Sequence, residues 1–346
     1  MILNVYFRFV NYSWRKLLFP FSWIYQGATS LRNKAFDWGV FESKSFGIPI
    51  ICVGNLSVGG TGKTPMIEWL IRHLSTTMEV AVLSRGYKRN SSGFQLFDSQ
   101  SSAVQMGDEP FQLAQKYTNI TVAVDANRRN GIEQLLLHRP HVQVILLDDA
   151  FQHRWVASDL KILLTTYDNP YHKDCVLPSG NLRESQSGAQ RADLIVVTKC
   201  PIELSSEMQS NFKNQLGLQS HQSCFFATIG YASRLKGENT PLVSDFIKKE
   251  FVLVTGIANP SNLIQYLDSL DAKYTHLLFS DHHNFSKGDI HRILQTAGQK
   301  PILTTEKDAV RLRSLLSDKS LFELPIETVF LNDSEPLITT IKQHLV

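Results

Sequence analysis

One stretch decides the fold of this chain: Ile51-Cys-Val-Gly-Asn-Leu-Ser-Val-Gly-Gly-Thr-Gly-Lys-Thr-Pro65. It runs from an apolar strand through a glycine-rich bend into the start of a predicted helix. Glycines lack a Cβ, so they can take positive φ and turn their N–H groups toward phosphate oxygens, and the positive N-terminus of the helix favours the same charge. Lys63 adds a compact cation, and Thr64 adds a hydroxyl for Mg²⁺. The stretch therefore predicts a phosphate-binding loop.

We expect nine consecutive residues of this stretch to bind the phosphates of a nucleotide. Pro65 suits the first turn of the helix, where no N–H is needed. The generic phosphate-loop pattern has Gly six positions before the Lys, whereas this chain has Ser57, so the match to the pattern is incomplete. The predicted nucleotide-binding residues are Ser57, Val58, Gly59, Gly60, Thr61, Gly62, Lys63, Thr64 and Pro65.

Paired acids end a second apolar run, Val144-Ile-Leu-Leu-Asp148-Asp149. A buried strand that ends in a carboxylate, downstream of a phosphate loop, is typical of the Walker B arrangement, in which the acid holds Mg²⁺ directly or through water. Strands that end in two acids are common, and by themselves they predict little. Because this one follows a phosphate loop in the chain, it predicts a magnesium site at Asp148 and Asp149.

The apolar runs of the chain recur with helical segments between them. Runs this continuous indicate strands buried on both faces, and the alternation with helices indicates a parallel sheet. We therefore predict an α/β fold with a mostly parallel, P-loop NTPase-like sheet flanked by helices and a smaller C-terminal α/β lobe. The runs are Pro49–Val53, Val80–Leu83, Ile120–Val124, Val142–Leu147, Leu160–Leu164, Leu194–Val197, Phe251–Val254 and Ile302–Thr304.

Composition divides the chain into four parts. We predict an N-terminal amphipathic region at 1–48, a core with the phosphate loop at 49–229, a linker at 230–250 and the smaller lobe at 251–346. The linker prediction depends on the Gly, Pro, Ser, Lys and Glu scattered between the β/α segments.

Charge and cysteine usage exclude some functions. The net charge is only +3 and no Lys/Arg-rich run follows the pattern of a nucleic-acid binder, so we expect no nucleic-acid partner. The four cysteines stand far apart without a C-x-x-C pair, which argues against a zinc knuckle or disulfide framework and indicates a reducing compartment.

The first 25 residues are rich in aromatic and aliphatic side chains, yet cations interrupt every window long enough to span a bilayer. On a helix, Asn4, Arg8, Asn11 and Arg15 form one polar stripe that leaves a broad apolar remainder. This pattern predicts a helix lying in the membrane interface. The alternative is a helix that docks its apolar face on the protein's own core.

Two further polar motifs leave their role open. Gly107-Asp108-Glu109-Pro110 places two acids at a predicted helix start, where capping and catalysis cannot be separated by sequence. Asp281-His282-His283 follows a strand-like stretch and can supply an imidazole to orient a base, or is simply exposed.

Two basic motifs are equally ambiguous. Arg183 and Glu184, in Pro178-Ser-Gly-Asn-Leu-Arg-Glu184, offer a cation for phosphoryl charge or form a surface ion pair. Arg85 directly follows the second predicted strand. The guanine signature Asn-Lys-x-Asp is missing, because Thr198-Lys-Cys-Pro201 lacks the Asp, so we expect ATP rather than GTP.

Taken together, these motifs resemble the tetraacyldisaccharide 4′-kinase family, whose members phosphorylate an acylated glucosamine disaccharide of the lipid A pathway. The resemblance covers almost the whole chain. The family's loop also has a hydroxyl residue at the position of Ser57, whereas Ala150 stands where the family usually has Gly. The motifs that carry it are Val53–Pro65, Leu83–Tyr87, Gly107–Pro110, Leu147–Arg154, Leu182–Glu184, Asp281-His282 and Thr305–Val310.

The resemblance implies a role for each motif. Asp108 becomes the general base, oriented by His282 as a dyad, with His283 as the other candidate for that partner. Lys63 and Arg183 become catalytic cations. The implied metal residues are Thr64, Asp148, Asp149 and Glu109, and the implied lining of the same cleft is Arg85, Gln152, His153 and Glu184.

The resemblance also implies the partners. ATP is the co-substrate with Mg²⁺, the acceptor is the 4′-hydroxyl of a tetraacyldisaccharide 1-phosphate, and the N-terminal helix lies on the cytoplasmic face of the inner membrane. We expect a peripheral, monomeric enzyme. Two other classes remain as alternatives: a membrane-surface switch ATPase, which does not need the Asp108 and His282 pair, and a non-catalytic lipid-binding scaffold, against which the intact Lys63-Thr64 and Asp148-Asp149 stand.

Overall fold

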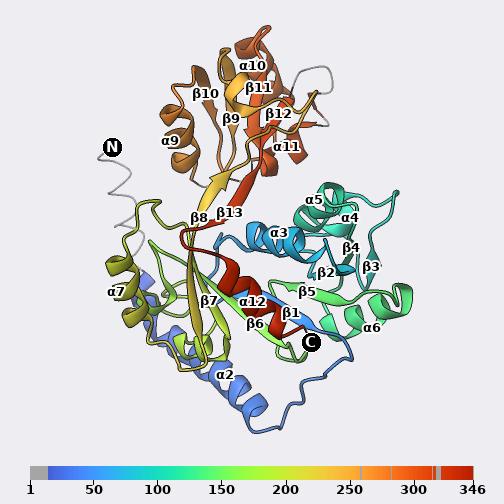
Figure 1. The fold of residues 1–346 in the computed structure, drawn as a ribbon, viewed down its shortest axis with the longest axis vertical. Coiled ribbons are helices and arrows are strands. Elements are labelled where there is room, and N and C mark those ends of the chain that lie inside the picture. Colours follow the sequence, from blue (N-terminus) through green and yellow to red (C-terminus); the bar gives the residue numbers. More distant parts are fainter. Residues whose placement is uncertain (1–14, 258, 282, 314, 317–320, 346) are drawn as a thin grey trace. The chain divides into compact units, whose positions relative to one another are not determined.

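The computed structural model describes residues 15–257, 259–281, 283–313, 315–316 and 321–345, and it divides into two compact units. The first unit comprises the chain up to Ile229 and again from Thr328 onward; the second is Gly230–Glu327. Each unit contains its own sheet (Figure 1). The last residues of the chain thus return to the first unit.

The first unit is built on a nine-stranded sheet. Its strands are parallel from β8 to β4. At one edge β3 pairs antiparallel with β4, and at the other the backbone hydrogen bonds from Ala232 to Pro325 and from Leu331 to Phe226 show that β13 runs antiparallel to β8. The strand order is β13 (Ile326–Phe330), β8 (Ser223–Tyr231), β7 (Leu194–Thr198), β6 (Leu160–Thr166), β1 (Ile50–Asn55), β5 (Val144–Asp148), β2 (Val80–Ser84), β4 (Thr121–Val124) and β3 (Gln95–Leu96).

Both faces of this sheet are buried. Along β1, Ile50 and Cys52 point into one hydrophobic core and Ile51 and Val53 into the other, as the period-two alternation of a strand requires. One core is closed by α3 (Lys63–Leu74), α5 (Asp108–Lys116) and α12 (Glu335–Gln343), and the opposite core by α6 (Arg128–His138) and α7 (Ser206–Leu216). This is why the strands of the sequence are continuous apolar runs.

The second unit repeats this arrangement on a smaller scale. Its four strands are parallel, in the order β10 (Tyr274–Leu278), β9 (Phe251–Thr255), β11 (Ile302–Thr305) and β12 (Leu321–Leu324). Two cores cover its faces, one closed by α8 (Val243–Phe246) and α9 (Ser261–Ser269), the other by α10 (Lys287–Ala297) and α11 (Glu306–Arg313). The segment 230–250, expected as a linker, carries α8, whose Val243 and Phe246 are buried in this unit.

The predicted fold class is confirmed, and each of the eight expected apolar runs contains a strand. The sequence analysis did not include β3, β8, β12 and β13 among its strands. Four short helical elements neither belong to a sheet nor cover one. They are η1 (Lys16–Leu18), α4 (Ala103–Met106), η2 (Tyr171–Lys173) and η3 (Gln186–Arg191).

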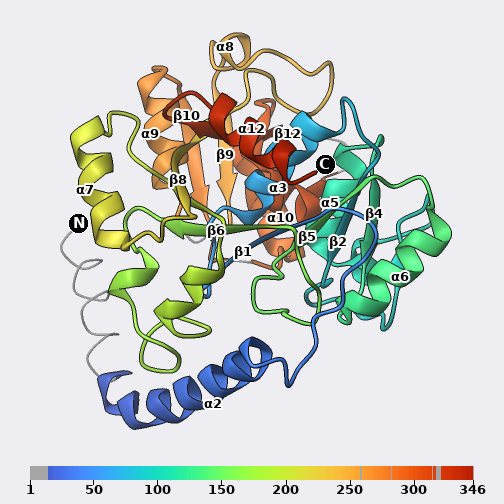
Figure 2. The same cartoon turned by 60° about the horizontal axis from the view of Figure 1, so that its bottom comes forward.

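The helix α2 (Phe19–Asp37) lies along the first unit (Figure 2), and its two buried residues are Ser22 and Phe36. Ser22 is buried and its hydroxyl lies 2.6 Å from the hydroxyl of Ser179. By contrast, Trp23, Ile24 and Leu31 are 66%, 71% and 64% exposed. Apart from Phe36, which packs against Trp155, the helix therefore leaves its large apolar side chains exposed, unlike an ordinary amphipathic helix on a protein core.

The polar stripe predicted for the first 15 residues falls mostly outside the described residues. Its last member, Arg15, donates hydrogen bonds to the backbone oxygens of Pro178 and Gly180 and to Asn181. Among the described helices, none is long and apolar enough to cross a membrane.

Candidate active site

The phosphate loop joins β1 to α3 and contains two residues with positive φ. Gly59 has φ +116° and Gly62 has φ +88°, a region that only glycine enters readily. A Cβ at Gly59 would meet nothing within 4 Å, so the loop surface is open there. Gly62 directly precedes α3, so the free N–H groups of that helix begin at the loop. The conformation is therefore that of an anion-binding loop.

Neighbouring segments hold the loop from two sides. Asn181 accepts a 2.8 Å hydrogen bond from the backbone N–H of Val58. Thr198, at the end of β7, donates a 2.8 Å hydrogen bond to the backbone oxygen of Thr61, and Asn55 donates one of the same length to the Thr61 hydroxyl. The loop is thus fixed by backbone and side-chain contacts before any ligand binds.

Two cations converge on Asp149. Lys63 Nζ lies 3.6 Å and Arg183 Nη1 lies 2.8 Å from the same Oδ1 atom. Burial acts to raise the pKa of the Asp149 carboxyl, but the charges of Lys63 and Arg183 outweigh it and the pKa lies below its usual value. Asp149 itself has φ +49°, whereas Ala150 is not among the residues with positive φ, so Ala fits at that position without backbone strain.

Asp148 has the opposite electrostatic environment. It ends β5 in a buried position, and burial raises its pKa to about 6, helped by the nearby charges of Glu109 and Asp149. Ser84 donates a 3.1 Å hydrogen bond to its Oδ2, but its Oδ1 is buried without a hydrogen-bond partner. A buried carboxylate oxygen without a partner is costly in a folded protein, and a cation would satisfy it.

These acids fit Mg²⁺ in the form that nucleotide sites use. Within the described residues, no cluster of three or more His, Cys, Asp or Glu side chains forms a complete metal cage. Mg²⁺ needs no such cage, because it keeps several waters and takes one or two carboxylates together with substrate phosphates. The unpartnered oxygen of Asp148, beside Asp149, is the observation that favours it.

Asp108 and Glu109 begin α5, and both are exposed. Gly107, just before them, packs against the turn after β2: a Cβ there would lie 3.0 Å from the backbone oxygen of Tyr87. The same turn follows Ser84, which contacts Asp148. The start of α5 therefore belongs to the same edge of the sheet as the paired acids.

The remaining expected cleft residues divide between the site and its support. Arg85 is exposed at the end of β2. Burial and the charges of Arg128, Arg85 and Arg32 lower the pKa of His153 to about 4. Gln152 donates to the backbone oxygen of Asn55.

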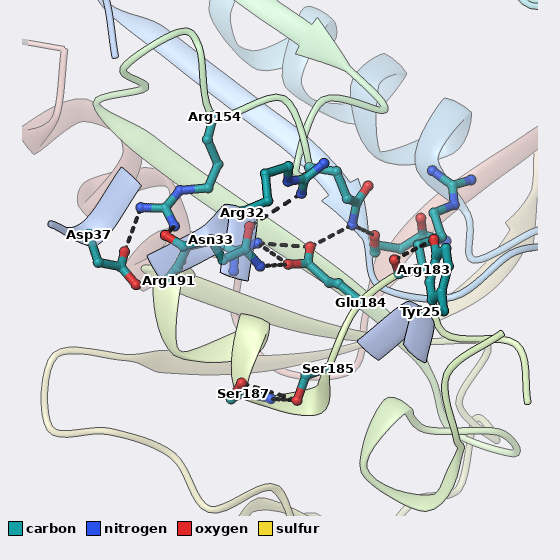
Figure 3. A network of polar contacts seen from close by, with 12 residues as sticks. Tyr25, Arg32, Asn33, Asp37, Arg154, Arg183, Glu184, Ser185, Ser187 and Arg191 are labelled. Atoms are coloured by element: carbon teal, nitrogen blue, oxygen red, sulfur yellow. Dashed lines mark hydrogen bonds and ion pairs between the residues drawn. The ribbon is translucent and has the colours of Figure 1, made fainter. Parts of the chain in front are cut away.

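Glu184 is fully buried and accepts hydrogen bonds from three side chains (Figure 3). Its donors are Asn33, Gln152 and Arg191, and Arg191 contacts both of its carboxylate oxygens. With these contacts, Glu184 serves as an anchor of the segment that carries Arg183.

The expected dyad partner, His282, lies outside the described residues. Its neighbour His283 lies 3.0 Å from Asp289 through Nε2 and 3.3 Å from the hydroxyl of Ser280 through Nδ1. Phe279 and Phe285 pack against the same ring. Both ring nitrogens of His283 therefore have partners within the second unit.

Sequence reasoning missed three residues that shape the site. Ser84 contacts Asp148, Asn55 holds the phosphate loop, and Arg128 is buried and donates to the backbone oxygen of Asp148 at 3.3 Å. Ser84 and Asn55 occupy the last positions of buried strands, and a polar residue at such a position is the signal that could have identified both. No comparable signal marks Arg128, which lies within a helix.

A parallel sheet with a glycine-rich loop before α3, Lys63 at that loop and paired acids at the end of the neighbouring strand defines the class of P-loop nucleotide-binding proteins. Comparison with known proteins gives the family. The family model for tetraacyldisaccharide-1-P 4′-kinase matches residues 14–346. The chain belongs to this family and is therefore a kinase of the lipid A pathway.

Individual relatives agree with the family match. A tetraacyldisaccharide 4′-kinase of Flavobacterium johnsoniae is 49% identical over 332 residues, which cover 96% of this chain and 97% of the relative. That of Bacteroides thetaiotaomicron is 43% identical and covers 96% and 92%. The crystal structure of the "apo" form of LpxK from Aquifex aeolicus in complex with ATP matches with a TM-score of 0.79 and 29% identity, over 96% of this chain and 99% of that one.

Proposed function

We propose that this family member transfers the γ-phosphoryl group of ATP to the 4′-hydroxyl of a tetraacyldisaccharide 1-phosphate. One observation carries the proposal: Lys63 and Arg183 meet on Asp149 next to the phosphate loop, beside an Asp148 oxygen that lacks a partner. Two cations and a magnesium-binding carboxylate are what phosphoryl transfer needs to neutralise the developing charge. A switch ATPase would share these groups, but the family's members act on a sugar hydroxyl, which disfavours that alternative.

The chemistry divides among the residues as follows. Asp108 accepts the proton as the 4′-oxygen bonds to the γ-phosphorus and the bond to the bridging oxygen of ADP breaks. Lys63 and Arg183 stabilise the phosphoryl oxygens, and the N–H groups of the loop hold the remaining phosphates. Asp148, Asp149, Thr64 and Glu109 would hold Mg²⁺, which would supply further neutralisation of phosphate charge.

His282 is proposed to orient Asp108. The contacts of His283 support this choice between the adjacent histidines, because its two ring nitrogens already have partners in Ser280 and Asp289. A ring with both nitrogens engaged is a poor partner for another carboxylate. All the other proposed site residues fall within the kinase core proposed for 49–229.

We propose that α2 binds the cytoplasmic surface of the inner membrane, where a lipid with several acyl chains must be met. The exposed Trp23, Ile24 and Leu31 support this, since a row of large apolar side chains turned to solvent is a binding surface rather than a stable water-facing one. The proposed attachment is peripheral. We also propose that the chain acts as a monomer, since the site residues described above come from one chain.

The decisive experiment supplies γ-labelled ATP and the lipid A precursor to the purified chain and identifies the labelled product by chromatography. We expect label on the disaccharide lipid. Asp108→Asn should lower the rate about 10²–10⁴-fold while ATP binding is retained, because only the base is lost. ATP hydrolysis without any labelled lipid would contradict the kinase proposal.

Membrane binding is tested separately with the double variant Trp23→Ser/Ile24→Ser. Both side chains are mostly exposed, so their replacement should leave the fold intact while removing apolar surface that can enter a bilayer. We therefore expect less protein to sediment with vesicles of phosphatidylethanolamine and phosphatidylglycerol. Unchanged sedimentation would mean that the exposed apolar side of α2 has another partner.

A further inference from the structure

The helix α2 reaches the nucleotide site through two separate series of hydrogen bonds, which begin at Tyr25 and Asn33 (Figure 3). This is unexpected for a helix whose proposed task is to lie on a membrane. The two series end on the phosphate loop and on Asp149.

The first series leads to the phosphate loop. Asn33 Nδ2 donates to Glu184 Oε2 at 2.6 Å, and Gln152 Nε2 donates to Glu184 Oε1 at 3.0 Å. The same Gln152 nitrogen lies 2.8 Å from the backbone oxygen of Asn55. Asn55 in turn donates to the Thr61 hydroxyl at 2.8 Å, within the loop.

The second series leads to the paired acids. The Tyr25 hydroxyl donates to the backbone oxygen of Arg183 at 2.9 Å. The guanidinium of Arg183 contacts Asp149 at 2.8 Å, and Lys63 lies 3.6 Å from the same carboxylate oxygen. Tyr25 and Asn33 thus hold the two adjacent residues 183 and 184 from one helix.

The first series gains weight from burial. Glu184 and Asn55 are both fully buried, so their polar atoms cannot exchange a lost partner for bulk water. The Tyr25 contact of the second series is exposed, and it adds a second attachment at the adjacent residue. A shift of α2 would therefore be transmitted to Glu184, and through the chain to Arg183. Sites that hold charges for phosphoryl transfer tolerate little misplacement.

We propose that Tyr25 and Asn33 are positioning residues for phosphoryl transfer, so that the helix facing the lipid also sets the geometry of the phosphate loop and of Arg183 and Asp149. This inference rests on the proposed kinase function. It adds that α2 acts on the nucleotide and not only on the lipid acceptor.

The test compares Tyr25→Phe and Asn33→Ala with Leu31→Ala, all in the full chain. Leu31 is an exposed apolar residue of the same helix, outside both series. Three quantities are measured: the affinity for a non-hydrolysable ATP analogue with Mg²⁺ in the absence of acceptor, the kcat and KM for the lipid, and sedimentation with phosphatidylethanolamine and phosphatidylglycerol vesicles.

We expect Tyr25→Phe and Asn33→Ala each to weaken analogue binding or lower kcat about fivefold, the usual effect of one lost hydrogen bond, with unchanged vesicle sedimentation. Leu31→Ala should instead reduce vesicle sedimentation and leave the affinity for the ATP analogue and the kcat unchanged. Unchanged nucleotide affinity and kcat in both positioning variants would overturn the inference. So would equal losses in every quantity together with a lower thermal midpoint, because that result indicates a structural role alone.

A double-variant cycle adds a second criterion that does not depend on a single substitution. If Asn33 acts through Gln152, the variant Asn33→Ala/Gln152→Ala should bind the analogue no more weakly than Gln152→Ala alone. If the double variant weakened analogue binding by the product of the two single effects, Asn33 and Gln152 would act independently and the first series would be contradicted. The wild-type chain, assayed in parallel for lipid labelling, tests the kinase function itself, so the two failures are distinguishable.

Discussion

The two sheets of this molecule have the same sequence of elements at one edge, but the loops there differ in the space around them. In both, a buried strand is followed by a glycine-containing loop and a helix: β1 leads to α3 and β9 leads to α9. At Gly59 and Gly60 a Cβ would meet nothing within 4 Å. At Gly256, after β9, a Cβ would lie 3.0 Å from Asp308 Oδ1 and 3.3 Å from the backbone oxygen of Ser280.

The difference lies in the space around the two loops. Asp308 accepts hydrogen bonds of 2.8 Å from the Gly256 N–H and the Thr305 hydroxyl, and its other oxygen, which has no hydrogen-bond partner, is 3.9 Å from Arg311. The second unit thus fills the edge where open α/β sheets usually bind ligands. The first unit also has a buried carboxylate oxygen without a hydrogen-bond partner, Asp148 Oδ1, but it leaves its loop open. An α/β fold therefore provides a possible site, and open space at the loop makes that site available to a ligand.

The largest effect should follow from Lys63→Ala. The loss of the cation next to Asp149 leaves phosphoryl charge unneutralised and should lower kcat about 10³-fold, as measured by transfer of label to the lipid. Lys44→Ala is the matched control, because Lys44 forms an exposed ion pair with Glu133 and should have no effect. Activity retained in Lys63→Ala would remove the functional distinction between the two sheet edges.

Asp308→Ala should act on stability instead. Removing a fully buried carboxylate that accepts from Gly256 and Thr305 should cost about 2–4 kcal/mol of unfolding free energy, measured with denaturant. The affinity for an ATP analogue should stay within about twofold of the wild type. Asp245→Ala, which breaks an exposed pair with Lys248, is the control for stability. Weakened nucleotide binding would show that the filled edge is also functional.

Gly60→Ala sharpens the comparison at the open edge. No atom obstructs the added methyl group and Gly60 has no positive φ, so the unfolding free energy should change by less than about 0.5 kcal/mol. The analogue affinity should fall about tenfold, because the methyl group stands where the backbone approaches phosphate. Gly27→Ala, which is equally unobstructed, should leave nucleotide binding intact. Equal affinity in both variants would mean that phosphate does not approach at Gly60.

The smallest effect is the pH dependence caused by His153. Its pKa is lowered from 6.5 to about 4, first by burial and then by Arg128, Arg85 and Arg32. The unfolded chain therefore binds a proton that the folded chain refuses, and stability is lost as pH falls from 6.5 through about 4. His153→Gln should flatten this loss by about 1 kcal/mol or less, because the side chain is partly exposed to solvent screening. If the unfolding free energies of the wild type and of His153→Gln fell in parallel with pH, the His153 ring would not be held neutral in the folded protein.

Sequence reasoning predicted the parts of the fold that local pattern determines. The central strands are continuous apolar runs, because both faces of the sheet are buried. The last two strands at one side of the sheet, β8 and β13, were not predicted, since their burial is partial and their alternation is weak. The phosphate loop was predictable because its glycines, Lys63 and Thr64 are contiguous.

Long-range contacts were not predictable in the same way. Glu184 resembles a surface acid in sequence and is fully buried, because its partners Asn33 and Gln152 are brought to it only by folding. The side of α2 that docks could not be derived either. The periodicity of the sequence shows that the helix has a polar and an apolar side. Which side contacts the protein depends on polar partners elsewhere in the chain, and these are not visible in the local sequence.

The separation of Asn33 from Glu184 has a consequence for biosynthesis. The two residues are 151 positions apart in the chain. At the usual pace of translation, α2 leaves the ribosome about 8–30 s before its carboxylate partner exists. With the proposed membrane binding of α2, the bilayer is the earliest surface that can cover Trp23 and Ile24 during that interval. Nascent chains should then meet the membrane before the catalytic domain has been completed.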